Sequence, residues 1–197
     1  MTDGLRRWLL PCILLAAALA LDYLSKTWVR ANLDYGQTQQ FLPGLINLTR
    51  SVNTGGAFGI GRGNGILMTC LASAIVLAIV FWSIQRERSK SPLNTLERCG
   101  IATIIGGALG NLLDRITRGE VTDFLEFAFI QFPIFNVADA LIDVGAGLVI
   151  IGTLAFSKNT STESEHSTNA SENQSRSPKP KDISTETSSS SDEASRG

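Results

Sequence analysis

Four long apolar stretches alternate with polar segments along this chain. They cover residues 8–29, 65–84, 95–113 and 133–156, and each approaches the roughly 20 residues that a helix needs to cross a bilayer. The second stretch is free of charged residues and has Trp82 near its end, a position typical of an interfacial anchor. The pattern therefore predicts an all-α polytopic membrane protein with four transmembrane helices.

The first stretch has two interpretations. Arg6 and Arg7 precede an apolar run that reaches Ala20, which is also the layout of a cleaved secretory signal peptide. However, apolar residues resume after Asp22 and continue to Val29, so the stretch has the length of a full span. This length favours a retained transmembrane helix.

The loops predict an orientation, because basic residues concentrate on the cytoplasmic side of membrane proteins. The amino terminus and the loop after the second stretch carry Arg6, Arg7, Arg86, Arg88, Lys90 and Arg98. The other two loops are longer but carry only Arg50, Arg62, Arg115 and Arg118. Both termini are therefore expected in the cytoplasm. Stretches 41–49 and 121–129, which then lie outside, mix β-branched and aromatic residues, so a small extracytoplasmic β-sheet is expected.

The composition changes at residue 157. Residues 157–197 are mostly small polar and charged, so we expect a disordered, Ser/Thr-rich cytoplasmic tail after a membrane domain at 1–156. The membrane domain holds 12 basic and 11 acidic residues, without the clustered basic face that binds nucleic acid. The only histidine, His166, lies in the tail, and the three cysteines are isolated. Neither a metal site nor Ser-His chemistry is therefore expected.

Two aspartates, Asp139 and Asp143, stand four residues apart inside the fourth apolar stretch. A carboxylate at membrane depth costs about 2.5–3.5 kcal/mol on insertion scales, so these side chains need an offsetting role. Asp123, in the preceding loop, could be brought against Asp139, and two carboxylates that share a proton can activate water for attack on a peptide carbonyl. From spacing alone, a simpler explanation is favoured, in which each aspartate caps a helix or pairs with Lys26, Arg115 or Arg118.

Other candidate groups have structural explanations. Ser25 and Lys26 are neighbours on a helix and do not face the same way, which argues against a Ser-Lys dyad. Asp22 and Lys26 are at i,i+4 and are expected to form an ion pair that fixes the first helix. The Gly-x-x-x-Gly spacing in GGALG (106–110) predicts close helix packing, and residues 53–56, Asn-Thr-Gly-Gly, predict a turn.

Four ordered motifs carry a specific resemblance. They are DYLSK (22–26), NTGGAF (53–58), GGALGNLLDRITRGEVTDF (106–124) and FNVAD (135–139). Together, and with their spacing relative to the four spans, they resemble signal peptidase II, the bacterial lipoprotein signal peptidase family, over residues 8–150. Presenilin-like proteases also use two aspartates but carry Gly-x-Gly-Asp in a span, where this chain has Gly-Ala-Gly-Leu at 145–148.

The resemblance implies an intramembrane aspartyl endopeptidase of the bacterial inner membrane. It would remove signal peptides from prolipoproteins by cutting before a diacylglyceryl-modified cysteine near the extracytoplasmic face. The implied catalytic residues are Asp123 and Asp139. Substrate would be held and oriented by Asn53, Asn111, Arg115 and Asn136, with support from Asp22, Lys26 and Asp114. The implied fold is four helices with a β-sheet cradle and a periplasmic helix, acting as a monomer among membrane lipids without metal or organic cofactor.

The chain departs from the family pattern at three positions. Gly56 replaces the usual Ala, Ala140 replaces the Ser that commonly follows the second aspartate, and Asp143 matches no family motif. A different class of function, a non-enzymatic four-span scaffold or transporter subunit, would use Asp139 and Asp143 to line an ion path. In that class Asp143 would matter as much as Asp139, and Asp123 would be expendable.

Overall fold

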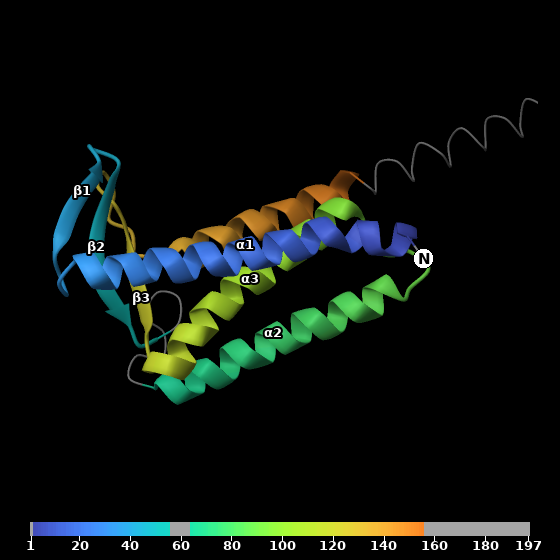
Figure 1. Cartoon of the computed structure of the whole chain (residues 1–197), viewed down its shortest axis with the longest axis horizontal. Coiled ribbons are helices and arrows are strands. Elements are labelled where there is room, and N and C mark those ends of the chain that lie inside the picture. Colours follow the sequence, from blue (N-terminus) through green and yellow to red (C-terminus); the bar gives the residue numbers. More distant parts are fainter. Residues whose placement is uncertain (1, 56–63, 156–197) are drawn as a thin grey trace, which may run out of the picture. The chain divides into compact units, whose positions relative to one another are not determined.

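The computed structural model describes residues 2–55 and 64–155, which lie within one unit, Met1–Ser157. In these ranges four helices are long and apolar enough to cross a membrane (Figure 1). They are α1 (Thr2–Asn32), α2 (Gly65–Glu87), α3 (Thr95–Arg118) and a fourth helix, Val137–Ala155. The four predicted spans are thereby confirmed. α1 continues unbroken past Ala20, so the first helix has the full length of a span.

The predicted start of the fourth span, at residue 133, is wrong. Phe135 instead forms an antiparallel bridge with Leu125, with distances of 2.7 and 3.0 Å between backbone nitrogen and carbonyl oxygen. The helix begins at Val137. The backbone of this segment is therefore held by a strand. Apolar pattern alone could not separate it from the helix that follows.

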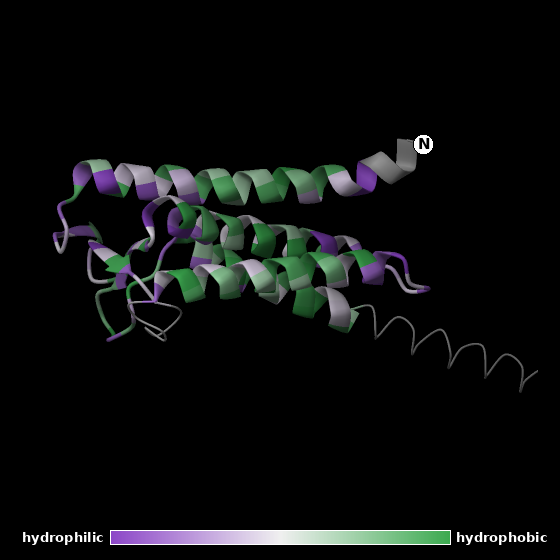
Figure 2. Cartoon of the chain, turned by 90° about the horizontal axis from the view of Figure 1, so that it is seen from below, coloured by the Kyte–Doolittle hydropathy of each residue, from purple (hydrophilic) through white to green (hydrophobic). Residues whose placement is uncertain are grey.

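The helices present apolar surface along their lengths, as the hydropathy colours of Figure 2 show. Leu24, Ile66 and Leu77 are more than 60% exposed, as suits side chains that face lipid. α3 differs from the other helices in its burial. In its most apolar stretch of 18 residues, 61% is buried inside the protein, against 11–17% in the other three spans. α1 and α2 both pack on α3, which is therefore the central helix.

Two glycines of α3 allow the neighbouring helices to approach. A Cβ atom on Gly106 would lie 2.7 Å from the carbonyl oxygen of Leu15 in α1. A Cβ atom on Gly107 would lie 2.7 Å from the carbonyl oxygen of Ala138 in the fourth helix. The close packing that the glycine spacing predicted is confirmed, and it sets the position of the residues just after Ala138.

A three-stranded antiparallel sheet lies at one end of the helices (Figure 1), in the order β1 (Thr38–Leu42), β2 (Ile46–Asn53), β3 (Val121–Phe127). The strand expected at 121–129 is confirmed, although β3 ends at Phe127. Short strands were also expected around 41–49, and this is confirmed as two strands, β1 and β2, because the chain reverses between Leu42 and Ile46. Pro43 lacks a backbone N–H for a ladder bond, and Gly44 has a φ of +72°, so this pair turns the chain into β2.

The sheet is tied to the end of α1 by apolar packing. Val29 of α1 and Leu33, the residue just after α1, form a buried cluster with Leu48 of β2 and Phe124 of β3. Arg50 of β2 adds hydrogen bonds from Nη1 to the carbonyl oxygens of residues 30 and 33, at 3.2 and 2.8 Å. These contacts hold the first half of β3, and with it Asp123, at the carboxyl end of α1.

Some expectations lie outside the described residues. They concern Gly56, the end of the second motif at Phe58, and the tail at 157–197. The implied periplasmic helix is not found among the described residues of the two loops on the sheet side, 33–55 and 119–136. Ala140, the other departure from the family pattern, lies half-buried in the first turn of the fourth helix.

Candidate active site

Asp123 and Asp139 meet at one asparagine. Asp123 is on β3 and is 4% exposed, and Asp139 lies in the first turn of the fourth helix. The side-chain Nδ2 of Asn136, which is fully buried, donates to Oδ1 of Asp123 at 2.6 Å. The backbone N–H of Asn136 donates to Oδ2 of Asp139 at 3.2 Å. The structure thus brings together the two carboxylates that lie sixteen residues apart in the sequence.

Asp139 also caps the fourth helix. Its backbone N–H donates to Oδ1 of Asn136 at 3.1 Å, while its carboxylate accepts from the Asn136 N–H, so the pair forms a capping box. The capping role that spacing favoured for Asp139 is therefore confirmed. Capping engages only Oδ2 of the Asp139 carboxylate. Its Oδ1 accepts a further hydrogen bond from Nδ2 of Asn111 at 2.8 Å.

A buried lysine orients Asn111. Lys26 is 1% exposed, and its Nζ donates to Oδ1 of Asn111 at 2.8 Å and to Oδ2 of Asp22 at 2.7 Å. Since Oδ1 of Asn111 faces the ammonium group, its Nδ2 is left to face Asp139. Oδ1 of Asp22 accepts from the backbone N–H of Ala138 at 3.0 Å, so the confirmed Asp22–Lys26 pair also holds the start of the fourth helix.

Asp114 connects the end of α3 to β3. Its carboxylate accepts from the backbone N–H of Thr122 at 3.2 Å and from Nη1 of Arg30 at 3.1 Å. Arg30 also donates to the hydroxyl of Thr122 at 3.0 Å. Arg118 lies 3.6 Å from the same carboxylate, but its side chain is 49% exposed. Asp114 therefore fixes the residue that immediately precedes Asp123.

The other two predicted substrate residues lie beside the aspartates. Asn53, at the end of β2, hydrogen-bonds the carboxylate of Asp123, and its Oδ1 accepts from the N–H of Gly55 at 2.9 Å, which confirms the predicted turn. Arg115 donates to the carbonyl oxygens of Gly55 at 3.1 Å and Asn111 at 3.3 Å. Its guanidinium thus holds the described end of the turn against α3, rather than forming an ion pair with Asp123 or Asp139.

Asp143 lies outside this network. It is exposed on the fourth helix, and no hydrogen bond or ion pair joins its side chain to another residue within 6–55 or 64–155. The two aspartates of this helix, equivalent by spacing, therefore differ in their surroundings. The ion path of the scaffold alternative, which needs both, finds no support in this arrangement.

The surroundings of Asp123 change its acidity. Its carboxyl has a pKa of about 6 against the ordinary 3.8, mainly because burial disfavours the charged form and secondly because the nearby charge of Asp139 does so too. Hydrogen bonds from Asn136 and Asn53 and the charge of Lys26 lower this pKa, but they do not cancel the effect of burial. Every buried side-chain nitrogen and oxygen of the described residues has a hydrogen-bond partner, so the network is fully satisfied.

Arg30 and Thr122 belong to this network but were missed by sequence reasoning. Arg30 lies four residues after Lys26 on α1 and thus on the same helix face, which is a signal that could have found it. Thr122 precedes Asp123, and nothing in its sequence context marks its hydroxyl as a partner of Arg30.

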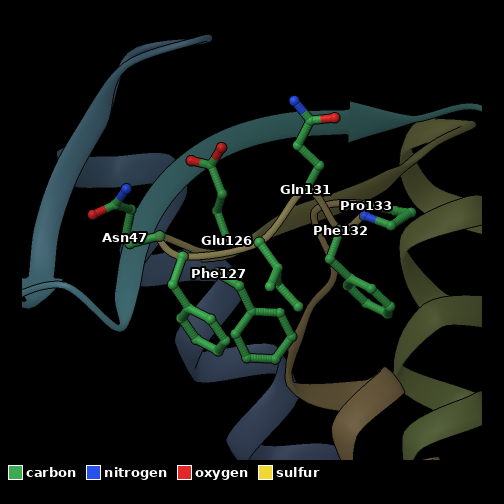
Figure 3. Close-up of a pocket in the computed structure, with 9 residues that line it drawn as sticks. Asn47, Glu126, Phe127, Gln131, Phe132 and Pro133 are labelled. Carbon is green, nitrogen blue, oxygen red and sulfur yellow. The ribbon is translucent and has the colours of Figure 1, made fainter.

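An aromatic cluster holds the segment between β3 and Asn136. The rings of Phe127 and Phe135 have centroids 5.2 Å apart, and Phe132 packs edge-on against Phe135 at 5.9 Å. The cluster borders an open cavity of about 650 Å³ (Figure 3), which residues 126–133 and Asn47 line. Neither aspartate lines this cavity, and the rings fix the residue just before Asn136.

Comparisons with known proteins agree with one another. Residues 14–155 match the family described as Signal peptidase (SPase) II. The chain is 38% identical to a lipoprotein signal peptidase of Gloeobacter violaceus, over 76% of this chain and 86% of that protein. It is 34% identical to one of Lactococcus lactis, over 74% and 94%.

Solved structures extend the likeness to the fold. A structure described as a bacterial membrane enzyme, determined by the in meso method at 2.3 Å resolution, matches with a TM-score of 0.68 and 28% identity. The match covers 76% of this chain and 90% of that chain.

Proposed function

The chain belongs to the signal peptidase II family, and from this premise we propose that Asp123 and Asp139 are its catalytic residues. It is a multi-pass membrane protein and an aspartic-type signal peptidase that removes signal peptides from prolipoproteins. The observation that carries the proposal is the convergence of both carboxylates on Asn136. No other pair of aspartate carboxylates in the described residues accepts hydrogen bonds from one neutral residue in this way.

In the proposed mechanism a water molecule lies between the two carboxyl groups. Asp139, whose oxygens accept N–H donors from Asn111 and Asn136, takes a proton from this water as its oxygen attacks the scissile carbonyl carbon. Asp123 holds the shared proton, because burial raises its pKa to about 6, and it protonates the oxyanion. Collapse of the tetrahedral intermediate then breaks the C–N bond. The proton held by Asp139 passes to the leaving amine, and a hydroxyl proton of the intermediate returns to Asp123 as the carboxylic acid forms.

The substrate that we propose is a prolipoprotein with a diacylglyceryl group on the cysteine after the cleavage site. Its acyl chains would lie between the helices, where burial contributes about 0.8 kcal/mol per methylene. Asn53, Asn111 and Arg115 surround the aspartates and would orient the peptide backbone. Asp22, Lys26 and Asp114 would act indirectly, by holding Asn111, Ala138 and Thr122 in place.

We propose that both termini lie in the cytoplasm and that the aspartates lie near the outer face. The basic residues Arg6, Arg7, Arg86, Arg88 and Lys90 gather at the helix ends that lie away from the sheet, which supports this orientation. All side chains of the network come from one chain, which supports a monomer as the working unit.

The decisive test is cleavage of a diacylated prolipoprotein by three variants, Asp123→Asn, Asp139→Asn and Asp143→Asn. We expect the first two to lose cleavage by at least about a thousandfold while remaining folded, since a neutral amide can neither take nor give the proton. Asp143→Asn, which makes the same charge change outside the network, serves as the control and should keep near-normal activity. Equal losses in Asp139→Asn and Asp143→Asn, with full activity in Asp123→Asn, would instead favour an ion path.

A further inference from the structure

An apolar cavity lies at the end of the helices opposite to Asp123 and Asp139. Its volume is about 320 Å³, and it lies between the start of α1, the end of α2 and the start of α3. Its walls are almost entirely hydrocarbon, from Trp8 and Leu15, Val80 and Ile84, and Ile101 and Ile105. This size is at the small end of ligand cavities, about 300–1,000 Å³, and suits a single extended chain of methylenes.

The mouth of this cavity is positively charged. Glu87 is the only acidic residue that lines it, and this carboxylate is engaged by Nη2 of Arg98 at 2.9 Å and lies 3.8 Å from Nη1 of Arg7. The Arg98 guanidinium also lies over the ring of Trp8, 5.6 Å from its centroid. Arg88 lines the cavity too, and its exposed side chain has no acidic partner among the described residues.

The charges at the mouth therefore do not balance. Arg7, Arg88 and Arg98 carry three positive charges against the single carboxylate of Glu87, which leaves a net positive charge beside an apolar chamber. Both lie at ends of membrane-spanning helices, where the headgroups of a bilayer would be. Basic pockets between transmembrane helices are known binding sites for acidic headgroups.

We propose that this cavity binds one anionic glycerophospholipid, with an acyl chain between α1, α2 and α3 and its phosphate at Arg88 and Arg7. The apolar walls provide affinity for the chain, and the excess of positive charge provides selectivity for a net negative headgroup over a zwitterionic one. The site is separate from the aspartates and does not depend on the proposed catalytic roles.

Native mass spectrometry of the full chain, with phosphatidylglycerol or phosphatidylcholine added to the detergent, tests the proposal. We expect one phosphatidylglycerol to remain bound per chain, in clear preference to phosphatidylcholine. Arg88→Gln should weaken phosphatidylglycerol binding about fivefold, the effect of one cation near an anionic surface. Lys90→Gln is the matched control, because Lys90 carries the same charge two residues away but does not line the cavity.

A second pair of variants tests the chamber itself. Cys12 lines the cavity from α1 and is exposed, so Cys12→Phe should fill it and remove the bound lipid. Ala16→Phe, one turn further along α1 and outside the lining, should not. Equal binding of both lipids, equal losses in Arg88→Gln and Lys90→Gln, or lipid retained in Cys12→Phe would overturn the proposal. So would a lipid-free dimer that Cys12→Phe dissociates, since the occupant would then be a second copy.

Discussion

Asn136 makes four hydrogen bonds that connect both aspartates to α3. Its Nδ2 donates to Asp123 and Asn111, its N–H donates to Asp139, and its Oδ1 accepts from the Asp139 N–H. One residue thus starts a helix and separates two carboxylates at a fixed spacing. These two tasks can be tested separately, because a hydroxyl can perform the first but not the second.

We predict that Asn136→Ser keeps the helix start but loses activity. Serine is a good N-cap, so the helix start is kept, whereas the donor to the buried Asp123 is lost. A hydrogen bond to a charged group contributes about 1.5–3 kcal/mol, so initial rates of prolipoprotein cleavage should fall at least about tenfold. Asn136→Ala, which removes the cap as well, should lose a further ~1 kcal/mol of stability. Serine and alanine variants with the same unfolding temperature would refute the capping part of this prediction.

The raised pKa of Asp123 predicts a pH dependence of stability. Its carboxyl has a pKa of about 6 in the folded protein and 3.8 ordinarily, so the folded state binds more protons between these values. Stability therefore decreases as the pH rises through this window, by about 3 kcal/mol in total from this group. Asp123→Asn cannot ionise and should escape this loss.

Thermal unfolding in detergent at pH 4.5 and pH 7.5 measures this effect. We expect Asp123→Asn to gain stability relative to the unmodified protein at pH 7.5, and the gain to shrink at pH 4.5. Asp34→Asn, on the exposed loop before β1, makes the same charge change away from the site and should show no such pattern. A gain of equal size at both pH values would mean that burial of the charge is not its cause.

Spacing along the chain predicted the local contacts of the site but not the distant ones. The Asp22–Lys26 pair followed from i,i+4 geometry, and the cap at Asp139 was expected because short polar side chains favour helix starts. The bonds from Asn111 to Lys26 and Asp139 join three helices. No periodicity within one segment encodes them, and only the family resemblance pointed to Asn111.

At the scale of elements, α3 determines how closely the other helices approach. Gly107 lies against the carbonyl oxygen of Ala138. The N–H of Ala138 donates to Asp22, and the next residue in the chain is Asp139. The glycine therefore sets the depth of the fourth helix in the site. A methyl group at this position has no flexible neighbour to displace, because the atom it would meet belongs to the backbone.

We predict that Gly107→Ala destabilises the protein by about 1–3 kcal/mol, the usual cost of overpacking, and lowers cleavage by shifting Asp139. The matched control is Gly147→Ala in the fourth helix, where an added Cβ atom would meet nothing within 4 Å. That change should be neutral or stabilise the helix by up to ~1 kcal/mol. Thermal unfolding and cleavage rates are measured together. A Gly107→Ala variant as stable and active as the control would show that the fourth helix can move without loss.

The elements were predicted where a single hydrophobic pattern dominates. The four spans were found from hydrophobic length, and α3 is the least apolar of them because much of its buried face is glycine and polar residues. Residues 133–135 are apolar like the helix that follows, but Phe135 exchanges backbone hydrogen bonds with Leu125 and is held as a β-bridge. The pattern around 41–49 predicted strands but did not locate the turn at Pro43 and Gly44 that divides them into β1 and β2.

At the scale of the whole membrane unit, two polar regions lie at opposite ends of one bundle. The sheet, the aspartates and Lys26 are at the end where α1 and α3 finish, and the basic cavity mouth is at the end where they begin. The basic residues near that mouth predict that it faces the cytoplasm. The signal peptides of exported prolipoproteins would then meet the aspartates near the outer face.

This orientation can be measured by cysteine labelling. Starting from a chain with Cys12, Cys70 and Cys99 replaced by alanine, single cysteines are placed at Gln39 of β1 or at Lys90 after α2, both of which are exposed. In intact spheroplasts a membrane-impermeant maleimide should label Gln39→Cys, and it should label Lys90→Cys only after the membrane is permeabilised. Prolipoprotein cleavage by each variant confirms that the labelled chain is folded. The reverse pattern would place the aspartates near the cytoplasm, where the proposed substrate could reach them only before export, and the orientation proposed from the basic residues would be wrong.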